Sequence, residues 1–217
     1  MFIRSALILL FISYIIFPGE LKVENAGFES AVTEDGRTVP AAWKIHKWTP
    51  GASAVCALEA GASGKYAASI RPNAAGGIGF ASPGMALPLN WKTLAVTFQL
   101  KLSDDIVKHT PWAFIAWNAG QKYLGRKNAE LDAFPRGQWK EVRILIDRTE
   151  IAADADTFML CLAAQGDSDG SGAVMYDDIS VRYEAAQKAS AASLVPNSGF
   201  EAVENGKPYP QPSQWSL

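Results

Sequence analysis

The sequence is poor in the residues that metal-dependent and nucleophilic enzymes use. Among its 217 residues are only two cysteines and two histidines, and no CxxC, HExxH or GxSxG motif occurs. Protein zinc sites are built from clustered Cys and His ligands, so the sequence gives no support for such a site. No Ser or Cys nucleophile motif surrounds His46 or His109. We expect both histidines to be surface or edge residues without a catalytic role.

Charge is also sparse. The formal net charge is −2 and the pI is about 5.7, with no long run of like charge. A nucleic-acid-binding domain usually carries a basic stripe, so we expect no nucleic-acid partner. The acidic segments 104–105 and 130–132 are polar and typical of a surface. They do not suggest the facing pair of acids, one of them in an apolar pocket, that a glycosidase needs.

Amphipathic helices are lacking too, and the apolar residues instead follow the period of strands. Apolar and polar residues alternate along 94–102 and, more briefly, along 142–146, which predicts strands with one buried face. The run 158–164 is apolar on both faces, as in a central strand, and 174–183 predicts a last strand. Further strands are predicted at 43–48, 54–60, 66–71, 78–87 and 112–117.

The segments between these strands are rich in Gly, Asp, Asn and Pro, which favour turns. About ten short strands at this spacing predict a β-sandwich or a barrel. The absence of helices between the strands argues against parallel βαβ units. We therefore predict an all-β fold.

One signature occurs twice in the chain. Asn25 to Trp43 and Asn197 to Trp215 both begin with Asn-x-Gly-Phe-Glu and end with Pro-x-x-Trp, at one constant offset without a gap. A period this long indicates an array of whole domains rather than a solenoid, whose units are about 20–50 residues long. We interpret 20–184 as one module, 185–193 as a small, polar linker, and 194–217 as the truncated start of a second module of the same type.

The N-terminal segment 1–19 resembles a targeting segment. Arg4 supplies a positive charge, and the apolar stretch 6–17, about 12 residues long, fits a signal peptide better than a membrane-spanning helix. No clear cleavage site follows at 17–20, so an uncleaved N-terminal anchor stays an alternative. We expect a protein that is secreted or at the cell surface. After removal of the signal it should show no stable membrane insertion and be a monomer within a longer chain.

Cys56 and Cys161 lie far apart in the sequence. Each lies in an apolar, strand-like run, which favours two buried thiols that pack as small apolar side chains. A disulfide is the alternative that an exported domain allows.

Four motifs occur in the order found in carbohydrate-binding modules of the family 4, 9 and 22 type, which this chain resembles. They are the opening Asn-x-Gly-Phe-Glu with its Pro-x-x-Trp, and the segments 63–70, 139–142 and 176–181. The resemblance covers 21–183 and implies a galactose-binding-like jelly roll, a β-sandwich of two antiparallel sheets whose first and last strands are adjacent. It also implies non-catalytic binding of a polysaccharide or oligosaccharide, in a protein that can include a glycoside hydrolase. The alternatives are a structural or adhesive repeat without a sugar site and an enzyme domain in its own right.

Adjacent terminal strands would bring Glu29 close to Asp177 and Asp178. Converging carboxylates repel one another unless a cation neutralises them, and calcium accepts carboxylates together with backbone carbonyls. The resemblance implies the same structural calcium. Strand parity places Asp177 inward with the apolar positions that follow it, which makes it the better ligand, and the carbonyl near Lys65 is a companion. The alternative is that Glu29 and Asp178 cap turns or pair with Lys or Arg.

The aromatic residues suggest where a sugar would bind, because a Trp or Tyr ring can stack on the apolar face of a sugar. Trp43 recurs in the second copy of the signature, so we expect it in the core. Trp112 and Trp117 have opposite parity on one strand, so at most one of them can line the concave face. We predict that Trp117 and Tyr123 form the stacking surface.

The rest of the predicted sugar site is polar. Asn118 and Gln121 would bind sugar hydroxyls next to that surface, and Trp112 completes the candidate set. The alternative is that all of these aromatic residues lie in the core.

Overall fold

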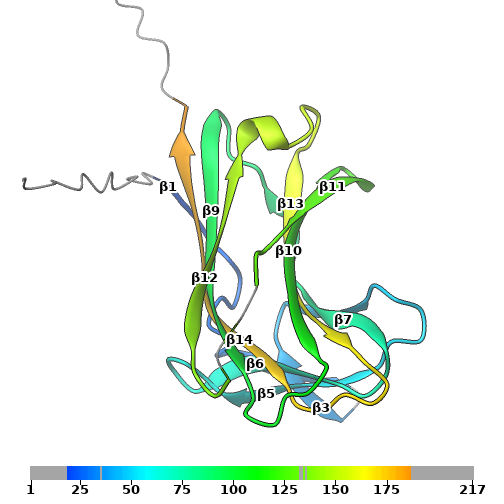
Figure 1. Cartoon of the computed structure of the whole chain (residues 1–217). Coiled ribbons are helices and arrows are strands. Elements are labelled where there is room, and N and C mark those ends of the chain that lie inside the picture. Colours follow the sequence, from blue (N-terminus) through cyan, green and yellow to red (C-terminus); the bar gives the residue numbers. More distant parts are fainter. Residues whose placement is uncertain (1–18, 35, 132–133, 135, 187–217) are drawn as a thin grey trace, which may run out of the picture. The chain divides into compact units, whose positions relative to one another are not determined.

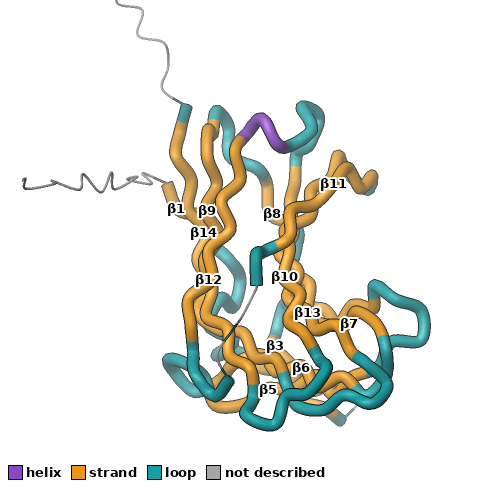
Figure 2. Tube along the Cα trace, in the orientation of Figure 1, coloured by secondary structure: helices purple, strands orange, loops and turns teal. Residues whose placement is uncertain are grey.

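A computed structural model of the chain describes residues 19–34, 36–131, 134 and 136–186. Strands dominate these residues, and their one helical element is a 3-10 turn, η1 (Arg148–Glu150), coloured purple in Figure 2. Nearly all of the predicted targeting segment 1–19, most of the linker 185–193 and the whole second-module segment 194–217 lie outside the described residues. None of the helices described is long and apolar enough to cross a membrane.

Two antiparallel sheets face each other (Figure 1). The first has the strand order β12 (Lys140–Asp147), β9 (Trp91–Leu102), β14 (Val174–Ala185), β6 (Tyr66–Pro72) and β5 (Ala54–Ala60), and β1 (Gly19–Leu21) pairs with β14. The second has the order β11 (Lys122–Asn128), β10 (Thr110–Ala119), β13 (Thr157–Gly166), β7 (Gly76–Ala81) and β4 (Lys44–Lys47), and β8 (Met85–Ala86) pairs with β13. A separate hairpin joins β2 (Ala31–Glu34) to β3 (Arg37–Pro40). The predicted all-β jelly roll is confirmed.

The core fills the space between the sheets, and the alternation predicted along 94–102 supplies its first-sheet side. Leu94, Phe98 and Leu100 are buried in β9, while polar residues between them face outward. Burying each such side chain contributes about 1.5–3 kcal/mol to the free energy of folding. The apolar face of β9 therefore points into the core. Trp43 also lies in this core, as predicted, and its indole N–H donates to the carbonyl of Glu24 at 3.1 Å.

The two cysteines belong to different sheets. Cys56 lies in β5 and Cys161 in β13, and both are buried free thiols, so the disulfide alternative is wrong. Burial raises the pKa of Cys56 to about 11 and that of Cys161 to about 12. Both thiols therefore stay protonated near neutral pH.

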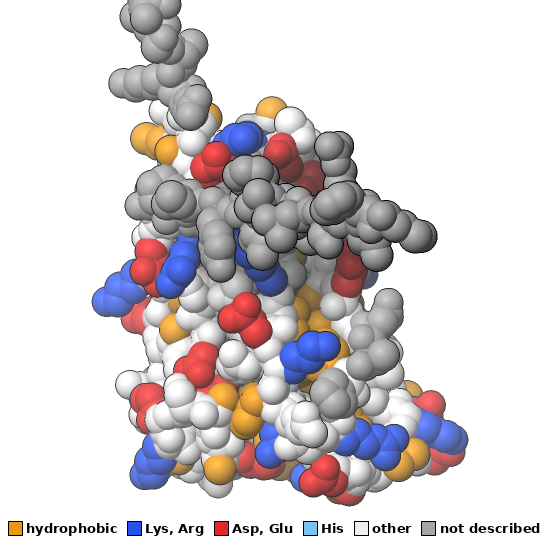
Figure 3. Space-filling model, turned by 60° about the vertical axis from the view of Figure 1, so that its left-hand side comes forward, with side chains coloured by type: hydrophobic (Ala, Val, Ile, Leu, Met, Phe, Trp, Pro, Cys, Tyr) orange, Lys and Arg blue, Asp and Glu red, His pale blue; other side chains and the backbone are white. Residues whose placement is uncertain are grey.

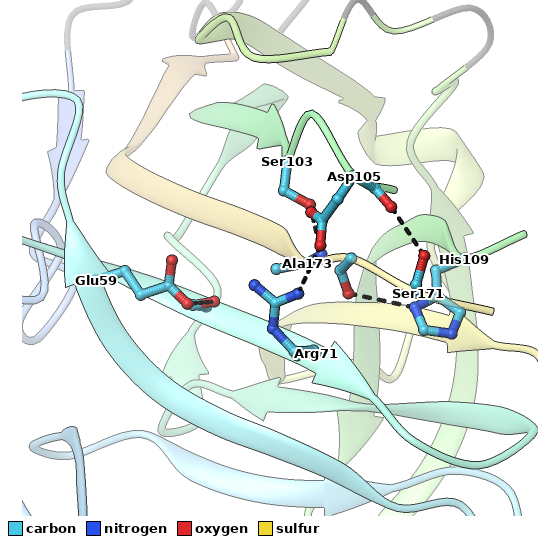
Figure 4. A network of polar contacts seen from close by, with 9 residues as sticks. Glu59, Arg71, Ser103, Asp105, His109, Ser171 and Ala173 are labelled. Atoms are coloured by element: carbon cyan, nitrogen blue, oxygen red, sulfur yellow. Dashed lines mark hydrogen bonds and ion pairs between the residues drawn. The ribbon is translucent and has the colours of Figure 1, made fainter. Parts of the chain in front are cut away.

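A polar network ties the loop after β9 to the loop before β14 (Figure 4). Ala173 donates its backbone N–H to the Ser103 hydroxyl at 2.7 Å, and the Ser171 hydroxyl donates to the carbonyl of Asp105 at 2.9 Å. The Asp105 carboxylate also accepts from Arg71 at 3.2 Å. The hydrogen bond from the Ser103 hydroxyl is the largest of the effects that lower the pKa of Asp105.

His109 is buried next to these two loops, so the prediction of a surface or edge position is wrong for it. Bridges from 107 and 108 to Ser171 connect the two loops. Nδ1 of His109 lies 3.3 Å from the carbonyl of Gly172, while Nε2 has no hydrogen-bond partner among the described residues. His46 is exposed on edge strand β4, as predicted.

Candidate functional site

The three acids predicted as metal ligands all reach one loop, residues 61–66. Oε1 of Glu29 accepts the backbone N–H groups of Lys65 at 2.8 Å and Tyr66 at 3.0 Å. Gly64 has a φ of +61°, and a Cβ there would lie 2.4 Å from the Glu29 carboxylate. The close approach of Glu29 therefore requires glycine at this turn.

Asp177 lies beneath the other side of the same loop and is fully buried. Its Oδ2 accepts the N–H groups of Ala62 at 2.8 Å and Ser63 at 3.3 Å, and its Oδ1 accepts that of Asp178 at 2.8 Å. Burial is the largest effect on this carboxyl and raises its pKa, although the three hydrogen bonds oppose the shift. Asp178 is exposed, and its Oδ1 accepts from the hydroxyl of Ser63 at 2.6 Å.

The parity argument for Asp177 is wrong in one respect. A β-bulge between Asp177 and Ser180, with Asp178 at a φ of +48°, adds one residue to β14. Before the bulge it is Tyr176 that points into the sandwich, where its hydroxyl donates to the carbonyl of Ala163 at 2.5 Å. Asp177 points the opposite way and is buried by the loop 61–66 instead of by the core.

The loop offers carbonyl oxygens as well as N–H groups. A Cβ at Gly61 would lie 2.5 Å from the carbonyl oxygen of Ser63, 2.7 Å from that of Tyr66 and 2.8 Å from Oδ2 of Asp177. A side chain at this position would clash with all three oxygens, so only glycine fits beneath the loop. Carboxylate and backbone carbonyl oxygens are the donor types that calcium binds in proteins, so the donor chemistry fits that ion.

The oxygens that converge near Gly61 are not all from the residues predicted as calcium ligands. It uses the carbonyls of Ser63 and Tyr66, whereas Lys65 contributes its N–H to Glu29. The described residues contain no group of three or more Asp, Glu, His or Cys side chains that could hold a metal. A calcium at this loop would therefore depend on backbone carbonyls as much as on Asp177. The hydrogen bonds of Glu29 and Asp178 match the predicted alternative, in which these two residues cap turns.

The predicted sugar-stacking residues separate in space. β10 places Trp112 and Trp117 on opposite faces of the second sheet, as parity predicts. Trp117 is only 6% exposed and belongs to the core, and a Cβ at Gly125 would lie 3.0 Å from its indole. Trp117 therefore cannot form an exposed platform, and that part of the prediction is wrong.

The other predicted residues lie at the tip of the β10–β11 hairpin. Tyr123 is 58% exposed and pairs with Asn118, and Gln121 lies exposed in the turn. Asn118 lies six positions after Trp112 along the strand, which corresponds to about 20 Å at the usual rise per residue. These polar groups therefore do not adjoin Trp112.

Trp112 instead belongs to an aromatic patch, consisting of Trp48, Trp112 and Phe114, on the outer face of the second sheet. The ring of Trp48 lies 5.6 Å from that of Trp112 and 5.3 Å from that of Phe114, both in edge-on contact. Both tryptophans are half-buried, so part of each ring stays accessible. Trp112 also donates to the side chain of Asn128 at 3.4 Å.

Small residues make this patch possible. The strands between Trp48 and Trp112 carry Gly77, Gly79 and Ala163 on the same face. A Cβ at Gly77 would lie 2.4 Å from the Trp112 ring, so the indole lies directly over the glycine backbone. The two tryptophans therefore meet across two intervening strands.

Sequence reasoning missed Trp48. The signal was present, because Trp43 and Trp48 have opposite parity on one predicted strand, so a core position for Trp43 places Trp48 on the outer face. The ring of His46 packs on Trp48, with 4.8 Å between the ring centroids.

A hollow of about 450 Å³ adjoins the patch. Ala81, Met159 and Cys161 form its floor, while Trp48 and the loop 82–84 form part of its walls. Pockets for small ligands have volumes of about 300–1,000 Å³ and are mostly apolar, as this one is.

The outer face of the first sheet has a different character. It carries a hollow of about 440 Å³ lined by polar and charged side chains, with no aromatic residue among them: Ala95, Thr97, Gln99, Glu141, Arg143, Asp178, Ser180 and Arg182. Figure 3 brings this side of the molecule forward, and acidic and basic side chains are interspersed on it. The aromatic patch thus combines accessible rings with an adjoining hollow, whereas no aromatic residue lines the hollow on the first sheet.

Comparison with solved structures shows which fold this is. The CBM22-1 xylan-binding domain from Paenibacillus barcinonensis Xyn10C superposes with a TM-score of 0.52, at 12% identity, over 74% of this chain and 93% of that one. A Stig cyclase, Fisc from Fischerella sp. TAU, solved with (3Z)-3-(1-methyl-2-pyrrolidinylidene)-3H-indole, superposes with a TM-score of 0.56, at 15% identity, over 77% and 98%. No protein-family model matches the sequence, and no curated protein matches it significantly.

The chain therefore has the galactose-binding-like jelly roll of carbohydrate-binding modules, as its ordered motifs predict. The same fold occurs in a sugar-binding module and in a cyclase, so the fold by itself does not define the activity.

Proposed function

We propose that this chain is a non-catalytic carbohydrate-binding module that binds a polysaccharide or oligosaccharide on the outer face of the second sheet. The aromatic patch carries the proposal, because Trp48 and Trp112 are half-buried outside the core and lie edge-on within 5.6 Å of each other. Such rings bind the apolar face of a sugar, and polar neighbours such as Asn128 can serve its hydroxyls.

The module would act as a targeting domain in an exported, multimodular protein, secreted or at the cell surface, that includes a glycoside hydrolase. The positive, then apolar, N-terminal sequence supports export, and the repeated Asn-x-Gly-Phe-Glu signature supports a second module. Tethering an enzyme to its polysaccharide raises the effective concentration of both.

A structural calcium at the loop 61–66 belongs to the same proposal. The buried carboxylate of Asp177 and the carbonyls of Ser63 and Tyr66 would hold it. The ion would neutralise a buried charge and link the loop to β14.

Affinity electrophoresis of the full chain in gels that contain soluble polysaccharides tests the sugar site. Trp48→Ala and Trp112→Ala should each weaken binding at least about tenfold, since buried aromatic anchors dominate such interfaces. Tyr123→Ala is the matched control, because it removes an exposed ring from the same face about 20 Å away along the strand. Loss of binding in Tyr123→Ala but not in Trp112→Ala would move the site to the hairpin. Absence of binding to every glycan would favour a structural or adhesive repeat.

One observation favours a second candidate, an enzyme or binding protein for a small apolar molecule. The hollow beside Trp48 has about 450 Å³ and is mostly apolar, and the superposed cyclase was solved with an indole compound. No carboxylate of the described residues lines the hollow, and burial raises the pKa of the Cys161 thiol to about 12, so His46 and Lys44 are the ionisable side chains that a reaction there would use. Titration calorimetry with indole and with glycans separates the two candidates.

A further inference from the structure

Arg126 lies against the aromatic patch. Its guanidinium carbon is 5.1 Å from the ring centroid of Trp112 and 5.1 Å from that of Phe114, from edge strand β11. The side chain is exposed, and no carboxylate of the described residues forms an ion pair with it. A cation thus lies beside the rings on which the proposed function places a sugar.

Because the side chain is exposed and its contacts with the two rings are cation–π contacts, N–H donors of this guanidinium stay available. The five N–H donors of Arg lie in the plane of the group, so rings that cover its face do not use them. Two parallel N–H groups match the two oxygens of a carboxylate, and this bidentate pairing is among the strongest polar contacts. Because Trp112 and Phe114 restrict the side chain before binding, less conformational entropy is lost when a carboxylate arrives.

No acidic side chain lies in the strand rows that surround Arg126. Strand register aligns the outward residues of this face in rows that contain no Asp or Glu. These rows run from Lys44 to Asn128, from His46 to Trp112, and from Met159 to Arg126. By contrast, the hollow on the first sheet mixes both signs of charge, with Glu141 and Asp178 beside two arginines.

We infer that the aromatic patch selects a carboxylate-bearing saccharide, a polymer of uronic acids, and that Arg126 is the residue that determines this specificity. The inference rests on the proposed function and adds the class of its ligand. The sugar ring stacks on the accessible parts of the tryptophans while its carboxylate accepts two N–H groups from the edge of the Arg126 guanidinium. A sulfate ester can also accept two N–H groups from the fork, but its sulfur lies one bond farther from the sugar ring than the carboxyl carbon of a uronic acid, so a sulfated polymer tests whether the acid must be a carboxylate on the ring.

Three polymers distinguish these chemistries in affinity electrophoresis and calorimetry with the full chain. They are polygalacturonate, the same polymer after reduction of its carboxyl groups, and dextran sulfate. The wild type should bind polygalacturonate about tenfold more tightly than the reduced polymer, since one hydrogen-bonded charge contributes about that factor. The affinity for polygalacturonate should also exceed that for dextran sulfate.

Variants identify the responsible residue. Arg126→Gln should remove the preference for polygalacturonate and leave binding of the reduced polymer unchanged or stronger. Arg126→Lys should give an intermediate preference, because charge is kept and the fork is lost. Lys122→Gln is the matched control, since it removes one exposed charge from the same strand away from the patch, and its affinity should change less than about twofold.

Several outcomes would overturn the inference. Equal binding of the reduced polymer would reject the acidic ligand while leaving the sugar site intact, and equal binding of dextran sulfate would reject recognition of a carboxylate. An equal loss of affinity in Arg126→Gln and Lys122→Gln would mean general charge attraction. If no glycan binds, the proposed function fails together with the inference.

Discussion

Calcium addition should stabilise the fold through the loop 61–66. Binding to the folded state alone adds about 2.7 kcal/mol to the free energy of unfolding at a hundredfold excess over the dissociation constant. For a domain of this size each kcal/mol shifts the melting temperature by about 2–4 °C, so the shift should be about 5–11 °C. The proposed site is built around Asp177, which is fully buried and accepts three backbone N–H groups, so its charge is both costly and fixed in position.

The increase in melting temperature that calcium causes should also depend on pH. Burial raises the folded-state pKa of Asp177 above its unfolded value of about 3.9. Without calcium, the stability that the neutral carboxyl contributes is therefore full below the unfolded pKa and is lost as pH rises through the folded pKa. Calcium needs the ionised form. Its stabilising effect should thus be small near pH 4 and large near pH 7.

Circular-dichroism melts of the full chain, with calcium or with EGTA, measure the stabilisation by calcium. A calcium concentration of about 10 mM is suitable, because extracellular calcium modules bind with dissociation constants of about 0.1–1 mM. Magnesium should be a poor substitute, since it demands a tighter octahedral site. Asp177→Asn should abolish the shift, whereas Asp154→Asn should retain it, because this exposed acid forms no hydrogen bond or ion pair with the described residues. Superimposable wild-type melts with calcium and with EGTA near pH 7 would refute the calcium site.

Three further outcomes are expected. Trp117→Ala should lower the free energy of unfolding by about 3–5 kcal/mol, because it leaves a cavity in the core, whereas Trp112→Ala should lower it clearly less. Urea denaturation of both variants measures the two losses, and equal losses would contradict the placement of Trp117 in the core. Cys56 and Cys161 should both resist Ellman's reagent near pH 8 in the folded protein and react after denaturation, because burial raises their pKa values to about 11 and 12. Rapid reaction of the native protein would contradict the burial of the two thiols. Deleting 193–217 should leave the melting temperature of the module unchanged, because β14, the last described strand of the sandwich, ends at Ala185. A large drop in the melting temperature would reject the predicted boundary.

The fold could be predicted because burial enforces a simple period. The run 94–102 had to place Leu94, Phe98 and Leu100 on one face, and the structure does so. β14 shows the limit of that reasoning, since the extra residue at Asp178 shifts the faces within one strand. A bulge arises from a local backbone conformation, which alternation of apolar residues does not encode.

The candidate site was harder to predict than the fold. Trp112 and Trp117 were correctly placed on opposite faces, but parity gives no indication of which of the two faces is the core. The patch also depends on Trp48, which is distant in sequence and reaches Trp112 only because Gly77 and Gly79 lie between them. Such a contact depends on the order of strands in the sheet, which no local pattern reveals.

The meeting of Trp48 and Trp112 across β7 and β13 also makes the patch an indicator of folding. Among the described strands β4 pairs with β7 alone, so Trp48 reaches its partner only after this short edge strand has docked. Two indoles 5.6 Å apart couple their electronic transitions, and the coupling vanishes when either strand detaches. The near-ultraviolet signal of the pair therefore reports completion of the second sheet, and the binding surface exists only in molecules that have reached that state.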